Sequence, residues 1–306
     1  MDVLADVLRT ARAGGTLSAR TVLHAPWGVA FGEELRAGFH VVVQGTCWLR
    51  LEDGSEPSQL VAGDVVYLPH GPRHVLSDAP GRPAQDWRRL YDEHAGSEVR
   101  VEGGGARTVL LCGSYRLDVD GPSPLLGALP AVVHVPADQA ARTGALAASL
   151  TLLAAELDAT RPGTDVAVER LIDLMLVYLL RAWLARQPAD CGGWLAAVAD
   201  PQVGRALALV HAEPGRRWTV DSLARAVGLS RAAFARRFTE RVGEPPLAYV
   251  TRWRMTVAAR LLREADQPLA AIADQVGYDS EFAFAKAFKR SRGLPPGRYR
   301  SAARAA

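Results

Sequence analysis

Hydrophobic and polar positions change their period part-way along the chain. Between residues 20 and 118, apolar and polar residues alternate over short runs such as "FHVVVQGTCWLRLE" and "DVVYLP", which Gly and Pro interrupt. A period of two with many β-branched residues predicts strands, and several short strands at close spacing predict a β-sandwich or small barrel. From Asp138 apolar residues recur at i, i+3, i+4 and i+7, which predicts amphipathic helices.

Two helical runs follow the strand-rich region directly. They are "ARTGALAASLTLLAAELDA" and "TDVAVERLIDLMLVYLLRAWLAR", and Arg161-Pro162-Gly163 separates them. Pro and Gly end helices, so the pair is predicted to form a helical hairpin. We interpret its surplus of Leu and Ala as a dimer contact on an outer stripe that includes Leu176 and Leu180, with packing inside one chain as the alternative. "QPADCGG" after the hairpin predicts a linker.

The last third of the chain contains one helical unit twice. The sequence "GEPPLAY", which begins at Gly243, recurs fifty residues later as "GLPPGRY". The same offset relates two pairs of aromatic residues, Phe234 to Phe284 and Phe238 to Phe288. Two copies are too few for a solenoid, so the repeat indicates a tandem of one small helical motif.

Each copy is predicted to be a helix-turn-helix. In the first, Thr219 and Ser230 can cap the two helices, and Gly228 lies where a helix end needs positive φ. The second helix then turns its Phe residues inward and its polar residues outward. The continuous helical pattern from Pro246 to Glu264 can hold the two copies apart. Reading helices roughly 34 Å apart would enter successive major grooves of DNA.

Charge is distributed unevenly along the chain. From Asp200 onward there are 19 Lys and Arg against 10 Asp and Glu, a net charge of +9, whereas the first 199 residues carry −6. A basic third on an acidic body favours a polyanionic partner, although a solvated basic surface has the same composition.

The composition otherwise predicts a soluble, cytoplasmic protein. The three cysteines, Cys47, Cys112 and Cys191, are widely spaced and odd in number, which predicts no disulfide framework. The N-terminal residues are too charged for a signal peptide, and the longest apolar stretch contains Asp173 and is too short for a membrane span.

The C-terminal region resembles the AraC/XylS family of bacterial transcription regulators. The segments "LARAVGLSRAAFARRF", "WRMTVAARLL" and "IADQVGYDSEFAFAKAFKRSRGLPPGRYR" match its two-unit signature over about one hundred residues. The resemblance implies binding to promoter double-stranded DNA, with RNA polymerase as a further partner. It implies base-edge contacts from Ala232, Ala235, Arg236, Glu281, Phe282, Ala285 and Lys286. The alanines offer apolar contact alone, so the polar readout rests mainly on Arg236 and Lys286. For Arg231, Arg237, Arg241 and Lys289, phosphate contact or solvation is the expectation.

The N-terminal region resembles the cupin-like effector domains that are fused to one branch of this family. In "GDVVYLPHGPRHVLSD", Gly63, Pro69, Gly71 and His74 follow the second cupin motif, in which a tight turn returns a His to the barrel. The first cupin motif is reduced to His40 in "FHVVVQG". The resemblance covers about residues 8 to 190.

His40, His74 and Cys112 lie on predicted strands that can face one barrel interior. Two imidazoles and a thiolate suit zinc or another transition metal. Each residue alone can equally be a satisfied core side chain, and Cys47 with Cys112 can instead form a redox pair. Cupin metalloenzymes take ligands from both motifs, so a metalloenzyme fused to a DNA-binding domain is the alternative, and a barrel that is only a scaffold is another. An organic-ligand pocket also stays open.

The sequence therefore predicts a multidomain α+β protein that is not an enzyme. We expect a cupin-like effector-sensing β-barrel over residues 1–137, a helical dimerisation segment over 138–190, and an all-α DNA-binding domain with two helix-turn-helix units over 200–306. The predicted function is sequence-specific regulation of transcription by a homodimer, controlled by a small molecule, a metal or a redox signal. We expect an activator, although the residues alone leave activator and repressor open.

Overall fold

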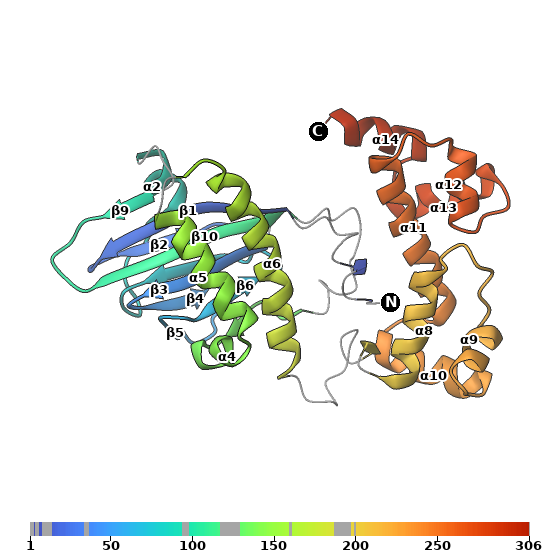
Figure 1. Cartoon of the computed structure of the whole chain (residues 1–306), viewed down its shortest axis with the longest axis horizontal. Helices are drawn as coiled ribbons and strands as arrows, with labels where there is room; N and C mark the ends of the chain where they lie inside the picture. Colours follow the sequence, from blue (N-terminus) through green and yellow to red (C-terminus); the bar gives the residue numbers. More distant parts are fainter. Residues whose placement is uncertain are drawn as a thin grey trace. The chain divides into compact units, whose positions relative to one another are not determined.

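The computed structural model describes residues 14–33, 37–93, 98–116, 129–158, 161–186 and 200–305, together with residues 3, 6, 7, 197 and 198 (Figure 1). These residues form two compact units. One contains the strands and the helical hairpin, and the other contains the C-terminal helices. The predicted linker at 187–193 and Cys191 lie outside the described residues.

Two facing β-sheets form the first unit. The larger sheet has six strands, in the order β11 (Val133–Val135), β6 (Val65–Leu68), β3 (Ala37–Gln44), β10 (Arg107–Arg116), β1 (Gly14–His24) and β9 (Glu98–Val101). The smaller sheet has five, in the order β5 (Ser58–Val61), β4 (Thr46–Leu51), β7 (His74–Ser77), β2 (Gly28–Phe31) and β8 (Gln85–Asp86). Helix α2 (Trp87–Glu93) follows β8. The short strands predicted from alternation are thus confirmed, as two sheets around one core.

The larger sheet is buried on both faces. Three helices follow its last strand: α4 (Ala137–Arg142), α5 (Ala145–Asp158) and α6 (Thr164–Leu184). Helix α6 packs against β1 and β11 (Figure 1), and the hydroxyl of Tyr115, on β10, donates to the Ile172 carbonyl at 2.9 Å. A Cβ on Gly15 would lie 2.1 Å from Ile172 Cγ2, so glycine lets β1 approach the helix. Burial on both faces explains why four consecutive residues of β3, Phe39 to Val42, are buried.

The hairpin differs from the prediction in the orientation of α6. Leu176 and Leu180 are buried against the sheet, so their assignment to an outer stripe was wrong. The exposed large apolar residues of the hairpin are instead Leu152, Val166 and Leu174. The sequence repeat of α6 is apolar almost all round, which leaves the packed side undetermined until the sheet is in place.

The second unit is all helical. Its helices are α8 (Pro201–Ala212), α9 (Val220–Ala226), α10 (Arg231–Val242), α11 (Pro246–Glu264), α12 (Leu269–Gln275), α13 (Glu281–Arg292) and α14 (Pro296–Ala305). Helix α11 runs between the pairs α9–α10 and α12–α13 and contacts both (Figure 1).

The caps and the turn predicted for the first helix-turn-helix unit are confirmed. Thr219 and Ser222 form a reciprocal capping box on α9, and the Ser230 hydroxyl accepts from the Ala233 amide at the start of α10. Ser280 caps α13 in the same way. Gly228 has a φ of 72°, which the sharp turn between α9 and α10 requires. Among the helices of the described ranges, none is both long and apolar enough to cross a lipid bilayer.

Candidate functional site

Helices α10 and α13 each bury one aromatic face and present the other side to solvent. Phe234 and Phe238 are fully buried, as are Phe284 and Phe288 of the second copy. The nine residues predicted to contact DNA lie on the opposite sides. Seven are exposed and two are half-buried, and they are Arg231, Ala232, Ala235, Arg236, Glu281, Phe282, Ala285, Lys286 and Lys289. Their contact with DNA stays a prediction.

Phe282 has the most exposed large apolar side chain of this set, at 80%. Its helix already buries two other Phe residues, so packing gives no reason for an aromatic ring here. An outward Phe on a reading helix can contact a thymine methyl group. Arg236 is also free to reach outward, since its one ion pair, to Glu240, is 3.9 Å long and exposed.

Arg237 and Arg241 have a structural role inside the unit. The Arg237 Nε donates to Asp200 Oδ2 at 3.0 Å, and Arg241 lies 3.8 Å from the same oxygen. Asp200 caps α8 by accepting from the amides of Gln202 and Val203. Hydrogen bonds from these amides and from Arg237 lower the pKa of the Asp200 carboxyl against the opposing effect of burial. The carboxylate therefore ties α8 to the first reading helix.

Arg254 of α11 connects the two helix-turn-helix units. Its Nε donates to the Pro214 carbonyl and its Nη2 to the Arg216 carbonyl, both at 2.8 Å, in the loop before α9. Its Nη1 donates to the Gly277 carbonyl, at 3.4 Å, in the turn before α13. A Cβ on Gly277, whose φ is 76°, would lie 2.5 Å from the Gly215 oxygen. The two loops thus pack directly together, with one guanidinium bonded to both.

In the other unit, the sheets bring His74, His40 and Cys112 together. His40 and Cys112 are cross-strand neighbours on β3 and β10, and His74 pairs with Phe31 on β7 and β2 of the facing sheet. His40 Nε2 lies 2.8 Å from His74 Nε2, and His40 Nδ1 lies 3.0 Å from Cys112 Sγ. The three predicted side chains therefore converge between the sheets, in a row with His40 in the middle.

The hydrogen-bond network fixes the direction of each bond in this row. His74 Nδ1 is 2.7 Å from the Pro72 carbonyl, which can only accept, so His74 donates there and accepts at Nε2. His40 then donates from Nε2 and accepts at Nδ1 from the Cys112 thiol. Burial lowers the pKa of His74 to about 4 and, together with the nearby His74, holds the pKa of His40 well below its usual value. Both imidazoles are uncharged at neutral pH.

Burial also keeps the thiols protonated. It raises the pKa of Cys47 to about 12, and it raises the pKa of Cys112 as well. The thiolate is the form that oxidants attack, so this environment disfavours a redox pair.

A metal ion would need donor atoms turned to one point. His40 instead turns a different ring nitrogen to each neighbour. Within the described part of the chain, no group of three His, Cys, Asp or Glu side chains is placed to hold one ion. Zinc stays a prediction for this site, and it requires the His40 ring to turn.

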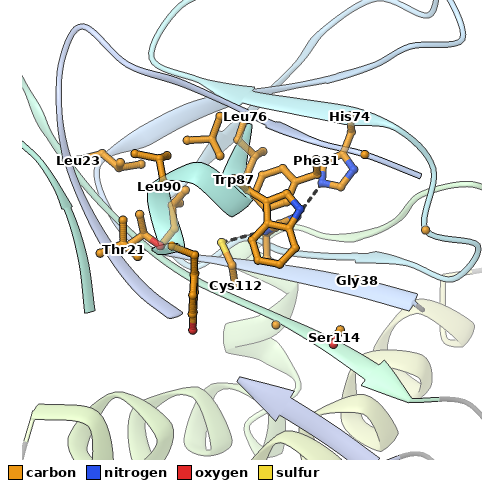
Figure 2. Close-up of a pocket in the computed structure, with 18 residues that line it drawn as sticks. Thr21, Leu23, Phe31, Gly38, His74, Leu76, Trp87, Leu90, Cys112 and Ser114 are labelled. Atoms are coloured by element: carbon orange, nitrogen blue, oxygen red, sulfur yellow. Dashed lines mark hydrogen bonds between the residues drawn. The ribbon is translucent and has the colours of Figure 1, made fainter. Parts of the chain in front are cut away.

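The row of three side chains forms one wall of a cavity of about 180 Å³ (Figure 2). Strands of both sheets line it, and α2 contributes Trp87, Leu90 and Tyr91. The sequence pattern did not indicate these three residues, nor Phe31 and Thr21. A Trp and a Tyr four residues apart on a short helix were the available signal, but nothing in the pattern placed that helix over the barrel.

Two family models match the chain. The one described as Cupin covers residues 2–185, and the one described as Helix-turn-helix domain covers residues 223–302. An AraC-like transcription regulator of Streptomyces lividans is 38% identical over 300 residues, which are 98% of each chain. The chain belongs to the AraC-like family of transcription regulators.

Other AraC-like regulators match over most of their length. The transcriptional regulator AlkR of Acinetobacter baylyi is 32% identical over 85% of this chain and 86% of its own. The "RCS-specific HTH-type transcriptional activator RclR" of Escherichia coli is 30% identical over 99% of both. Among solved structures, the DNA-binding domain of AdpA in complex with a target DNA is 32% identical, over 35% of this chain and 95% of that one, with a TM-score of 0.33. As an AraC-like regulator, the protein binds DNA and controls transcription.

Proposed function

We propose that this regulator binds promoter DNA through α10 and α13, and that a small molecule in the barrel cavity controls the binding. The observation that carries the proposal is the cavity of about 180 Å³, lined by both sheets and by α2, in a chain that also carries two reading helices. Apolar clefts and cavities with a few polar groups are the usual form of small-molecule sites.

For DNA reading we propose two kinds of contact. Base edges are contacted by Arg236, Lys286 and Phe282. The small side chains of Ala232, Ala235 and Ala285 allow the helices to approach the bases closely. Glu281 accepts a hydrogen bond from an exocyclic amine of a base. Arg231 and Lys289 contact phosphates. The exposure of these side chains supports this division, because each can reach DNA without disturbing the buried aromatic face.

We propose that the partner of the helical hairpin is a second copy of the chain. One face of α5 is exposed and uncharged, and it carries Ala145, Ala148, Leu152 and Ala155. Small residues at this spacing let two helices approach closely, and Leu152, 55% exposed, would be buried by the contact.

The remaining proposals concern the regulatory output. We propose that the protein activates transcription by contacting RNA polymerase, and that it acts in the cytoplasm, where the chromosome is. The name of RclR as an activator supports the first. We also propose that the cavity binds without turnover, because the relatives named above are all transcription regulators.

Zinc at His40, His74 and Cys112 is a separate proposal with its own test. Protein purified without chelator would contain about one metal per chain, and His74→Ala would lose it. Metal-free wild-type protein would leave the cavity to an organic ligand.

The cavity can be tested by filling it. Val99 lines it and is buried, and Val99→Phe would occupy part of the space. A promoter fragment that the wild-type protein captures is placed before a reporter gene. Reporter output in cells with the wild-type protein should then vary with growth condition. Val99→Phe should bind the fragment in vitro as wild type does, but its reporter output should be constant. Val43→Phe, at an exposed position of β3, is the matched control. Equal variation with wild type and Val99→Phe would remove the cavity from the function.

A further inference from the structure

The cavity walls are mainly apolar. Leu23, Val29, Leu76, Leu90, Val99 and Leu110 contribute side chains from both sheets and α2. Of the described residues that line the cavity, none is Asp, Glu, Lys or Arg. A charged ligand would therefore lose its hydration without gaining an ion pair, which disfavours its binding.

One side of the cavity is built of flat rings. The Phe31 ring stacks on the His74 ring with centroids 4.7 Å apart, and it stacks on the Trp87 ring with centroids 6.4 Å apart. Tyr91 meets Trp87 edge-on at 5.8 Å (Figure 2 shows Phe31, Trp87 and His74 together). Aromatic faces and edges at these distances favour a further ring in the free space.

The row of His74, His40 and Cys112 has no free hydrogen-bond donor for an anionic group. Each imidazole N–H is used: His74 donates to the Pro72 carbonyl, and His40 donates to His74. The Cys112 thiol lies within hydrogen-bond distance of the remaining His40 nitrogen. No imidazole proton is left for a carboxylate. The hydroxyls of Thr21, Ser114 and Tyr91 can still bond one neutral polar group.

Size limits the ligand as well. An apolar cavity of about 150 Å³ is known to hold benzene. The volume here, about 180 Å³, therefore fits one six-membered ring with a small substituent.

We propose that the effector of this regulator is a compact, uncharged molecule of single-ring size that carries at most one hydroxyl or carbonyl group. The inference rests on the proposed role of the cavity and names its ligand class. Anionic and cationic analogues of the same shape are excluded by the cost of losing their hydration.

A set of matched probes tests this class. The full chain is titrated with benzyl alcohol, benzylamine and benzoate, which share one ring and differ in charge, and binding is followed by tryptophan fluorescence and by the melting temperature. Benzyl alcohol should bind and raise the melting temperature, whereas benzylamine and benzoate should bind about 100-fold more weakly or worse. Val99→Phe should abolish the alcohol response, and Val43→Phe should retain it. Loss of the fluorescence change in Trp87→Phe would assign that change to the cavity.

Three results would overturn the inference: tighter binding of benzoate or benzylamine, no response to benzyl alcohol, or zinc that stabilises the chain and competes with the alcohol. These failures differ from a failure of the proposed function. A charged probe or zinc that binds wild type but not Val99→Phe would change the ligand class and leave the regulatory cavity standing. A reporter unaffected by Val99→Phe would end the regulatory role even if benzyl alcohol binds.

Discussion

Arg236 and Arg237 are neighbours in α10 with opposite surroundings. Arg236 is 74% exposed on the reading face, whereas Arg237 bonds to the buried Asp200 carboxylate. Arg236→Ala should lower the affinity for the specific site by roughly 1–3 kcal/mol and relax the preference at one base pair, while the fold is unaffected. Fluorescence anisotropy on a duplex selected from a random library measures both effects.

Arg237→Ala is the matched comparison. It removes the closer of the two Arg partners of Asp200 and leaves the more distant Arg241, so it should lower the free energy of unfolding by roughly 1–2 kcal/mol. Base preference should be retained. If Arg236→Ala kept full affinity and preference while Arg237→Ala altered the preference, the orientation of α10 toward DNA would be wrong.

His211 gives the helical unit a pH-dependent stability. Burial, and secondly the charge of Arg252, lowers its pKa to about 3, although the Asp6 carboxylate lies 3.7 Å from Nδ1 and opposes the shift. Its ring stacks on Trp253, and Nε2 is 2.7 Å from the Tyr249 hydroxyl. In the unfolded chain the pKa is about 6.5, so below that pH only the unfolded state binds the proton. The free energy of unfolding should fall by about 2–3 kcal/mol between pH 7 and pH 4.5.

His211→Phe keeps the stacking on Trp253 and removes the titration. Urea unfolding of both proteins at pH 7 and pH 4.5 should show a smaller loss for the variant. Parallel losses would mean that other groups cause the pH dependence.

At this scale the sequence was informative where a signal is local. Thr219, Ser230 and Gly228 were predicted in their roles because caps and turns depend on a few adjacent residues. His74 was placed by the spacing of the second cupin motif, and His40 and Cys112 by predicted strands that can face the same barrel interior. Phe31 and Trp87 were missed because their position depends on how the two sheets and α2 pack.

At the scale of elements, we expect Arg254 to help fix the spacing of the two reading helices, because it bonds to the loops of both units. Arg254→Met would remove its hydrogen bonds to the loops on either side. Wild type should lose about 1–3 kcal/mol of binding when one base pair is inserted between its two half-sites, whereas the variant should lose much less. Binding to duplexes of both spacings measures the difference.

Arg252→Met is the control on the same helix, because Arg252 pairs with Glu244 inside the first helix-turn-helix unit. It should retain the wild-type spacing preference. A variant Arg254→Met with that preference intact would show that α11 alone sets the spacing.

The exposed face of α5 makes a second prediction at this scale. Leu152→Lys would place a charge in the proposed dimer contact, so sedimentation at micromolar concentration should show a monomer with unchanged melting temperature. Val61→Lys, at an exposed position of β5, should stay dimeric. A monomeric wild type would end the dimer proposal.

The helical hairpin illustrates what periodicity cannot determine. The break at Arg161-Pro162-Gly163 was predicted correctly, since α5 ends at Asp158 and α6 begins at Thr164. The side of α6 that packs was predicted incorrectly: Leu176 and Leu180 are buried. Which side packs depends on the neighbouring elements, whose positions no local pattern contains.

On the scale of the whole molecule, the chain combines a cavity and a DNA-reading unit. The two have opposite electrostatic requirements. The cavity excludes charge, whereas the C-terminal third carries a net charge of +9 that attracts phosphates at long range. This division was readable from the sequence, because charge and hydrophobic period both change along the chain.

The central claim is that the full chain reads DNA sequence. The most direct test is the affinity of the purified chain for its selected duplex and for a shuffled duplex of the same composition, between 50 and 200 mM salt. We expect the selected duplex to bind about 10³-fold more tightly or better, with affinity for both falling linearly on logarithmic axes as salt rises. Equal affinity for the two duplexes, or binding that salt does not weaken, would contradict the account.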